Sequence, residues 1–87
     1  MKMPNKEYLL EWVTRKPIPK NFTITDLDAL MAKCGCQKRQ GGRGSGIAYY
    51  NERTGRILQF DAPHPGNELK IYQIKKVITY LKDIGEI

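Results

Sequence analysis

The sequence predicts an α+β domain in which two helices are followed by three antiparallel strands and a final helix. Apolar residues recur at helical spacing in three segments, 6–16, 24–34 and 71–83. Between the second and third segments the pattern changes to short strands separated by glycine-containing turns. A three-stranded sheet with helices on one face buries enough area to be stable.

The first helix is expected over residues 6–16. Asn5 is a suitable N-cap, because its short side chain can accept a hydrogen bond from the first turn. The apolar face consists of Leu9, Trp12 and Val13. Pro17 ends the helix, since the residue before a proline is disfavoured in the helical conformation, and its neighbours "PIPKNF" form a proline-stiffened linker. We assign residues 1–22 to an N-terminal helical extension with its linker and residues 23–87 to the main domain.

The second helix begins at a cap supplied by Thr23 or Thr25. Asp26 and Asp28 fall in its first turn, where carboxylates meet the positive end of the helix dipole. The apolar residues at helical spacing are Ile24, Leu27, Met31 and Cys34, with Leu30 beside them. Gly35 then provides a C-cap.

Three strands are expected next, in the segments "CQKRQ", "GIAYYNE" and "GRILQFDA". The stretch "ERTG", closed by Gly55, forms the turn between the second and third strands. "PHPG" ends the third strand, and the last helix runs from Ile71 to Asp83. We expect its buried side to consist of Ile71, Ile74, Val77, Ile78 and Leu81.

The 87-residue chain carries a net charge of +6 and has a pI of about 9.5. From Lys33 to Arg56 there are six bases and one acid. Such a patch suits nucleic acid or an acidic protein partner, or it is a solvated face that keeps the protein soluble. No apolar run approaches the roughly 20 residues that span a bilayer, and "MKMPNKEY" lacks a signal-peptide core. We therefore expect a cytoplasmic protein with no membrane contact.

Neither cysteine predicts a disulfide or a metal centre. Cys34 and Cys36 are two residues apart, which is too close for an easy disulfide. With His64, the single histidine, they would supply three ligands, whereas a closed zinc site takes four. We interpret them as small half-buried residues and expect neither metal nor cofactor.

The segment "KRQGGRGSGIAYY", residues 38–50, contains four closely spaced glycines. It is neither a Walker A loop nor a dinucleotide-binding fingerprint, because a strand follows it where those motifs need a helix. A hairpin tip with glycines at positive φ would explain the glycines but not the neighbouring bases. A loop whose backbone approaches a nucleic-acid backbone fits better, with Arg43 supplying charge and Ser45 a hydroxyl and an N–H.

Three motifs together resemble the HicA toxins of bacterial and archaeal type II toxin–antitoxin modules. They are the helix "TDLDALMAKCGC" that leads into a strand, the loop "GGRGSG", and the segment "PHPGNELKIYQIKKVITYLK". The resemblance covers about three quarters of the chain, from Thr23 to Ile87. It implies a fold like the double-stranded-RNA-binding domain, α-β-β-β-α, to which the first helix is an addition. It also implies a metal-independent ribonuclease that cleaves mRNA and is covered by a HicB-type antitoxin.

The sequence departs from the family at one position that bears on catalysis. In the family the Gly-Ser pair is usually followed by a catalytic histidine, but here Gly46 follows Ser45. His64 matches the family's His-Pro-Gly turn and is the remaining acid–base candidate; alternatively, it hydrogen-bonds to the backbone and shapes the turn. Two other outcomes stay open: cleavage by charge and positioning alone, or RNA binding without cleavage. A third class, an interaction domain for an acidic protein, fits the charge but leaves the glycine loop unexplained.

The candidate RNA-binding residues are basic or aromatic side chains in and around the glycine loop and before the last helix. We assign this role to Lys38, Arg39, Arg43, Ser45, Tyr49 and Lys70. Tyr49 and Tyr50 are adjacent in a strand and must face opposite ways, so that one belongs to the core and the other is free to stack on a base. We assign the stacking role to Tyr49.

Overall fold

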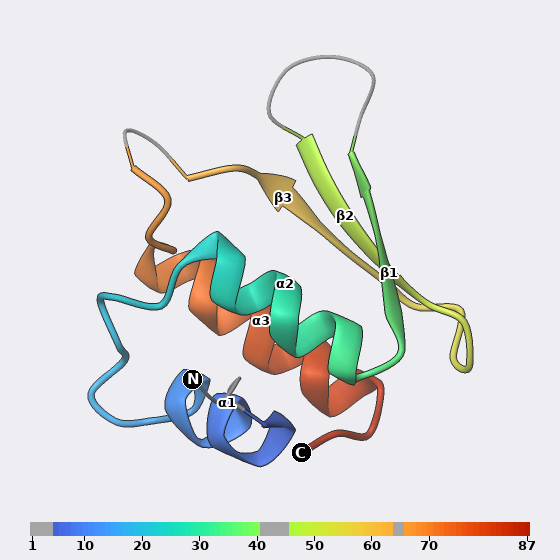
Figure 1. Cartoon of the computed structure of the whole chain (residues 1–87), viewed down its shortest axis with the longest axis horizontal. Helices are drawn as coiled ribbons and strands as arrows, with labels where there is room; N and C mark the ends of the chain where they lie inside the picture. Colours follow the sequence, from blue (N-terminus) through green and yellow to red (C-terminus); the bar gives the residue numbers. More distant parts are fainter. Residues whose placement is uncertain (1–4, 41–45, 64–65) are drawn as a thin grey trace.

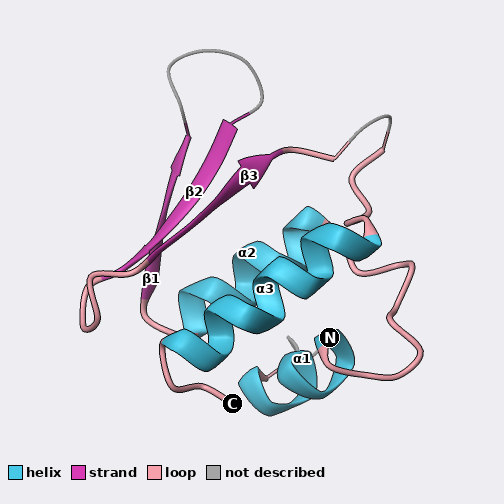
Figure 2. Cartoon of the chain, turned by 180° about the vertical axis from the view of Figure 1, so that it is seen from behind, coloured by secondary structure: helices cyan, strands magenta, loops and turns pink. Residues whose placement is uncertain are grey.

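The computed structural model describes residues 5–40, 46–63 and 66–87. Its elements follow one another in the order α1 (Lys6–Val13), α2 (Ile24–Lys33), β1 (Cys36–Gln40), β2 (Gly46–Asn51), β3 (Ile57–Asp61) and α3 (Ile71–Asp83). The strands form an antiparallel sheet in the order β1-β2-β3. Helices α2 and α3 cover one face of the sheet, and α1 lies on the side of these helices away from the sheet (Figures 1 and 2). The predicted α+β layout with an additional N-terminal helix is confirmed.

Local capping explains where the first two helices begin. The Asn5 side chain accepts a hydrogen bond of 2.7 Å from the Tyr8 N–H. Thr23, rather than Thr25, caps α2: its hydroxyl accepts from the Asp26 N–H, and the Asp26 carboxylate accepts in return from the Thr23 N–H. This reciprocal pair is a capping box, which satisfies two N–H groups that a helix start would otherwise leave without partners.

The first helix is shorter than the sequence predicted. It ends at Val13 instead of continuing to residue 16. The Thr14 hydroxyl donates to the Leu10 carbonyl at 2.7 Å, and the Arg15 N–H bonds to the Trp12 carbonyl, three residues back. The helix therefore closes with a tighter turn before the prolines of the linker are reached.

The alternation of each strand divides the sheet into a covered inner face and an open outer face. On β2, Ile47, Tyr49 and Asn51 are buried against the helices, whereas the residues between them are half-buried. Asn51 is polar but satisfied, because its amide donates to the Cys34 carbonyl and its side-chain oxygen accepts from the Thr54 N–H. Gly55 closes the β2–β3 turn at φ +73°, a conformation that favours glycine.

Helix α3 occupies the predicted bounds but buries a different set of side chains. Its buried residues are Gln73, Ile74, Val77, Tyr80 and Leu81. Ile71, expected in the core, is 51% exposed. The buried residues centre on the side of α3 that carries Val77, and at 3.6 residues per turn Ile71 points away from that side. Gln73 is buried with its polar groups paired: it accepts from the Lys70 N–H and donates to the Asp61 carbonyl.

The N-terminal extension belongs to the same core as the rest of the chain. Leu9 and Val13 are fully buried, as is Phe22 at the end of the linker. The Trp12 ring meets the Phe22 ring edge-on, with 4.8 Å between centroids. Lys6 forms an ion pair of 2.6 Å with Glu86, which ties the start of α1 to the end of the chain.

The two cysteines are free thiols in this core. Burial is the main cause that raises the pKa of Cys34 to about 12. A thiol with such a pKa is almost entirely protonated at neutral pH, and the protonated form is a poor nucleophile. Cys34 therefore serves packing rather than chemistry.

Within residues 5–40, 46–63 and 66–87, no helix has the length and apolar character that a bilayer crossing requires. The same residues contain no group of three or more His, Cys, Asp or Glu side chains arranged to hold a metal ion.

Candidate nucleic-acid interface

The candidate interface is built around one end of the sheet, which we call the loop end. Here β1 ends at Gln40, β2 begins at Gly46 and β3 ends at Asp61 (Figure 1). From Asp61 the chain continues toward the start of α3. Three predicted site residues lie outside the described residues: Arg43, Ser45 and His64.

Lys38 and Arg39 are both exposed, but they face opposite sides of β1. Lys38 points to the helical side, where its Nζ lies 3.1 Å from Oδ2 of Asp28 in α2. Arg39 lies on the outer face, with its guanidinium 5.5 Å from the centre of the Tyr50 ring. Lys38 thus has an anionic partner within the protein, whereas Arg39 forms no ion pair with any described residue, and its charge can contact an external phosphate.

The structure corrects the choice of Tyr49 as the stacking residue. Tyr49 is 1% exposed, and its hydroxyl donates to Oδ1 of Asp28 at 2.6 Å. Burial, followed by the hydrogen bond to Asp28, raises the pKa of Tyr49 well above its usual value. A ring so enclosed cannot stack on a base. Its neighbour Tyr50 faces outward and is the residue available for that contact.

Removing the Tyr49 hydroxyl should affect stability rather than RNA binding. We expect Tyr49→Phe to lower the free energy of unfolding by about 1–3 kcal/mol, because Asp28 loses a half-buried, charge-assisted hydrogen bond. Urea denaturation measures this loss, and an RNA-binding titration should give an unchanged affinity. Tyr50→Phe is the matched control, for which a change within about 0.5 kcal/mol is expected. Equal losses in the two variants would contradict the structural role of Tyr49.

The outer face of the sheet combines apolar and polar side chains whose proximity was not predicted from the sequence. Tyr50 pairs directly with Ile57 of β3, which is 57% exposed. Ala48 and then Gly46 follow Tyr50 on the same face toward the loop end, and Gly46 pairs with Asp61. A Cβ placed on Gly46 would meet no atom of the described residues within 4 Å. Position 46, where the family that the sequence resembles usually has a histidine, is therefore on the open face, and no described residue fills the space in front of it.

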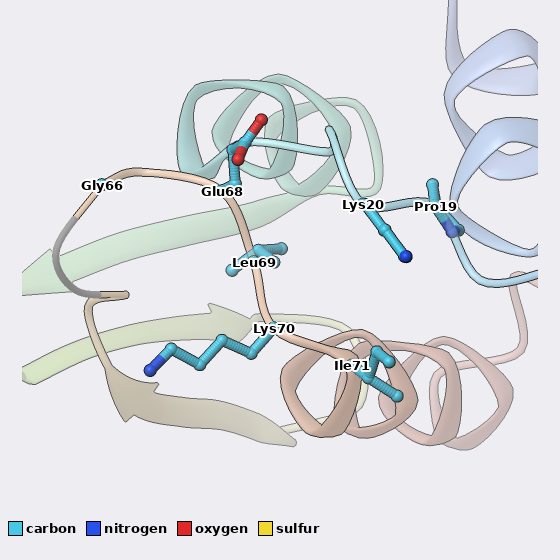
Figure 3. A pocket seen from close by; sticks show the side chains of 7 residues that line it. All are labelled: Pro19, Lys20, Gly66, Glu68, Leu69, Lys70 and Ile71. Atoms are coloured by element: carbon cyan, nitrogen blue, oxygen red, sulfur yellow. The ribbon is translucent and has the colours of Figure 1, made fainter.

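The last predicted residue, Lys70, is exposed at the N-cap of α3 and lines a pocket of about 500 Å³. Figure 3 shows that the opposite wall of this pocket comes from the linker, through Pro19 and Lys20. Lys20 was not predicted, because a single lysine in a proline-rich linker has no periodicity or motif that would mark it. Only the pairing of the linker with the segment before α3 places Lys20 and Lys70 around the same pocket.

The class of the protein follows from these features: it is a small basic α+β domain with the α-β-β-β-α layout of a double-stranded-RNA-binding domain and an added N-terminal helix. The family model described as HicA toxin of bacterial toxin–antitoxin matches residues 24–86. The chain therefore belongs to the HicA toxin family. Membership implies an antitoxin partner. No curated protein and no solved structure matches the chain significantly.

Proposed function

We propose that this HicA toxin is a metal-independent ribonuclease that binds and cleaves mRNA in the cytoplasm and is neutralised by a HicB-type antitoxin. The observation that carries the proposal is the family match over residues 24–86. The charge distribution supports it, since Arg39 and Lys70 are exposed bases near the loop end of the sheet. Tyr50 on the outer face adds a ring that can stack on a base.

The proposed reaction is transfer of the phosphodiester within the RNA. The 2′-oxygen bonds to phosphorus while the bond from phosphorus to the 5′-oxygen breaks, which leaves a 2′,3′-cyclic phosphate and a free 5′-hydroxyl. A base must take the proton of the 2′-hydroxyl, and an acid must give one to the leaving 5′-oxygen. Histidine suits both tasks because its pKa lies near neutrality. We propose His64 for this acid–base role.

The bases of the interface would stabilise the charge that develops on the phosphate. Arg43 and Lys70, together with the hydroxyl and N–H of Ser45, are proposed to hold the phosphate oxygens. Fixed donors of this kind contribute to the rate separately from proton transfer. Cleavage can therefore persist, at a reduced rate, with glycine at position 46.

A second candidate function is RNA binding without cleavage. One observation favours it: position 46 is glycine, where the family that the sequence resembles has its catalytic histidine. A single general acid or base contributes roughly 10²–10⁴ in rate, so the loss of one could leave a protein that binds RNA and does not cut it.

Incubation of the purified protein with labelled mRNA in EDTA, beside His64→Ala, tests the proposal. Cleavage by the wild type alone is expected and would establish His64 as essential for metal-free cleavage. Cleavage by both proteins would contradict the role of His64 and move the chemistry to the glycine loop and its bases. Binding without cleavage by either protein would favour the second candidate. In cells, the toxin alone should stop growth, and its co-expressed antitoxin should restore it.

A further inference from the structure

We propose that the pocket between the linker and the segment before α3 is a subsite for one nucleotide of a single-stranded RNA. We call it the linker pocket; it is lined by Pro19, Lys20, Gly66, Glu68, Leu69, Lys70 and Ile71. This inference rests on the proposed function. It goes beyond that function because it assigns RNA contact to the N-terminal extension, which precedes the residues that match the family.

Backbone pairing holds the two walls of the linker pocket together. The Leu69 N–H donates to the Phe22 carbonyl at 2.8 Å, and the Ile24 N–H donates to the Asn67 carbonyl at the same distance. Thr23 and Glu68 form the bridge between these two bonds. Phe22 is itself fully buried against Trp12. The pocket is therefore a fixed part of the fold, and its shape depends on the extension.

The chemistry of the walls matches a nucleotide with its flanking phosphates. Lys20 and Lys70 are exposed, and neither forms an ion pair with any residue that the structure describes. Their side chains point away from each other and lie on opposite sides of Leu69 (Figure 3). Lys70 extends toward the strands, and Lys20 extends away from them. Two separated ammonium groups with apolar surface between them fit two successive phosphates with a base between.

The remaining lining residues agree with this interpretation. The Glu68 carboxylate, the acidic group of the lining, points toward α2 and away from both ammonium groups (Figure 3). Ile71 and Pro19 supply apolar surface, and Ile71 is about half exposed although it is a large apolar residue. A base seated on Ile71 would cover that surface. An acidic peptide would use the lysines but has no comparable need for the apolar floor.

The linker pocket would extend the path of the RNA beyond the sheet. From the loop end, the RNA would pass Lys70 and continue over Leu69 and Ile71 to Lys20. The extension would then contribute one phosphate contact through Lys20 and apolar surface through Pro19, without taking part in the chemistry.

The matched variants Lys20→Gln and Lys16→Gln test the inference in the full chain. Both lysines are exposed and lie in the same segment, but Lys16 is outside the linker pocket. Fluorescence anisotropy with a single-stranded 2′-O-methyl oligonucleotide measures binding alone, because this probe lacks the attacking hydroxyl. For Lys20→Gln we expect weaker binding and a slope of log affinity against log salt that is shallower by about 0.7, the value for one phosphate contact on a single strand. Lys16→Gln should match the wild type.

A third variant, Ile71→Ser, separates the base contact from the phosphate contact. It should weaken binding several-fold with no change in the salt slope, because no charge is removed. Thermal unfolding should show that all three variants fold, as each alters an exposed side chain.

Three results would overturn the inference, and they differ in what they say about the proposed function. If Lys20→Gln binds like Lys16→Gln while Arg39→Gln binds more weakly, RNA binding stands and the linker pocket is not part of it. If the wild type binds no RNA, both proposals fail. If Lys20→Gln retains its affinity for the oligonucleotide but loses affinity for the antitoxin, the pocket is a protein-binding site.

Discussion

Replacing Gly46 with histidine is expected to raise the rate of RNA cleavage by about 10²-fold or more. The substitution places an imidazole where the family that the sequence resembles usually has its catalytic histidine. One general acid or base contributes roughly 10²–10⁴ in rate. The described residues accept the change: Gly46 begins β2 on the open outer face, its φ is not positive, and an added Cβ meets none of their atoms within 4 Å. The strand should lose no stability, since glycine is a poor strand residue.

Cleavage of labelled RNA in EDTA over a range of pH measures the effect. The pH dependence of the rate for Gly46→His should show a group with a pKa of about 6.5, the value of an unperturbed histidine. Ala48→His is the matched control, because it adds the same side chain to the same face two residues farther from the loop end. A rate for Gly46→His no higher than that of Ala48→His would show that acid–base catalysis at position 46 does not limit this protein.

The second large effect concerns stability: Leu9→Ala is expected to lower the free energy of unfolding by about 2–5 kcal/mol. Leu9 lies in α1, outside the region that matches the family, yet its side chain is fully buried in the core. Truncating a buried leucine loses the free energy of burial and leaves a cavity that the surroundings fill only partly. For a domain of this size, such a loss lowers the melting temperature by about 8–40 °C.

Thermal and urea denaturation followed by circular dichroism check this prediction. Leu10→Ala is the matched control, because Leu10 is the next residue and is only partly buried; its loss should be less than half as large. Equal, small losses in both variants would mean that α1 is dispensable for the fold. The larger loss for Leu9 would show that the extension is a structural part of this toxin.

The sequence alone was sufficient for the order of the elements and most of their bounds. The three strands and α3 lie where turns, glycines and apolar spacing predicted them, because these signals act between residues only a few positions apart. Capping is equally local: Asn5 and Thr23 bond to N–H groups three residues on. Family membership could also be inferred from sequence, since three motifs carry the resemblance and the family model matches residues 24–86.

The sequence could not decide which side chains face the core where both choices were apolar or aromatic. Alternation required Tyr49 and Tyr50 to face opposite ways, but the packing of α2 on the sheet decided which ring was buried. Asp28, whose carboxylate receives the Tyr49 hydroxyl, lies 21 residues earlier in the chain. Periodicity likewise included Ile71 in the core, although the buried side of α3 centres on Val77 and Ile71 points away from it.

The make-up of the candidate interface was decided by tertiary structure most of all. Lys20 and Lys70 line the same pocket because two backbone hydrogen bonds join distant segments. The Leu69 N–H donates to the Phe22 carbonyl across 47 positions of sequence, and the Ile24 N–H donates to the Asn67 carbonyl across 43. The pairing of Gly46 with Asp61, and of Tyr50 with Ile57, depends in the same way on strand register. Local propensity determines which elements form, whereas the neighbours of a side chain depend on how distant elements pack, and that packing is a property of the whole core.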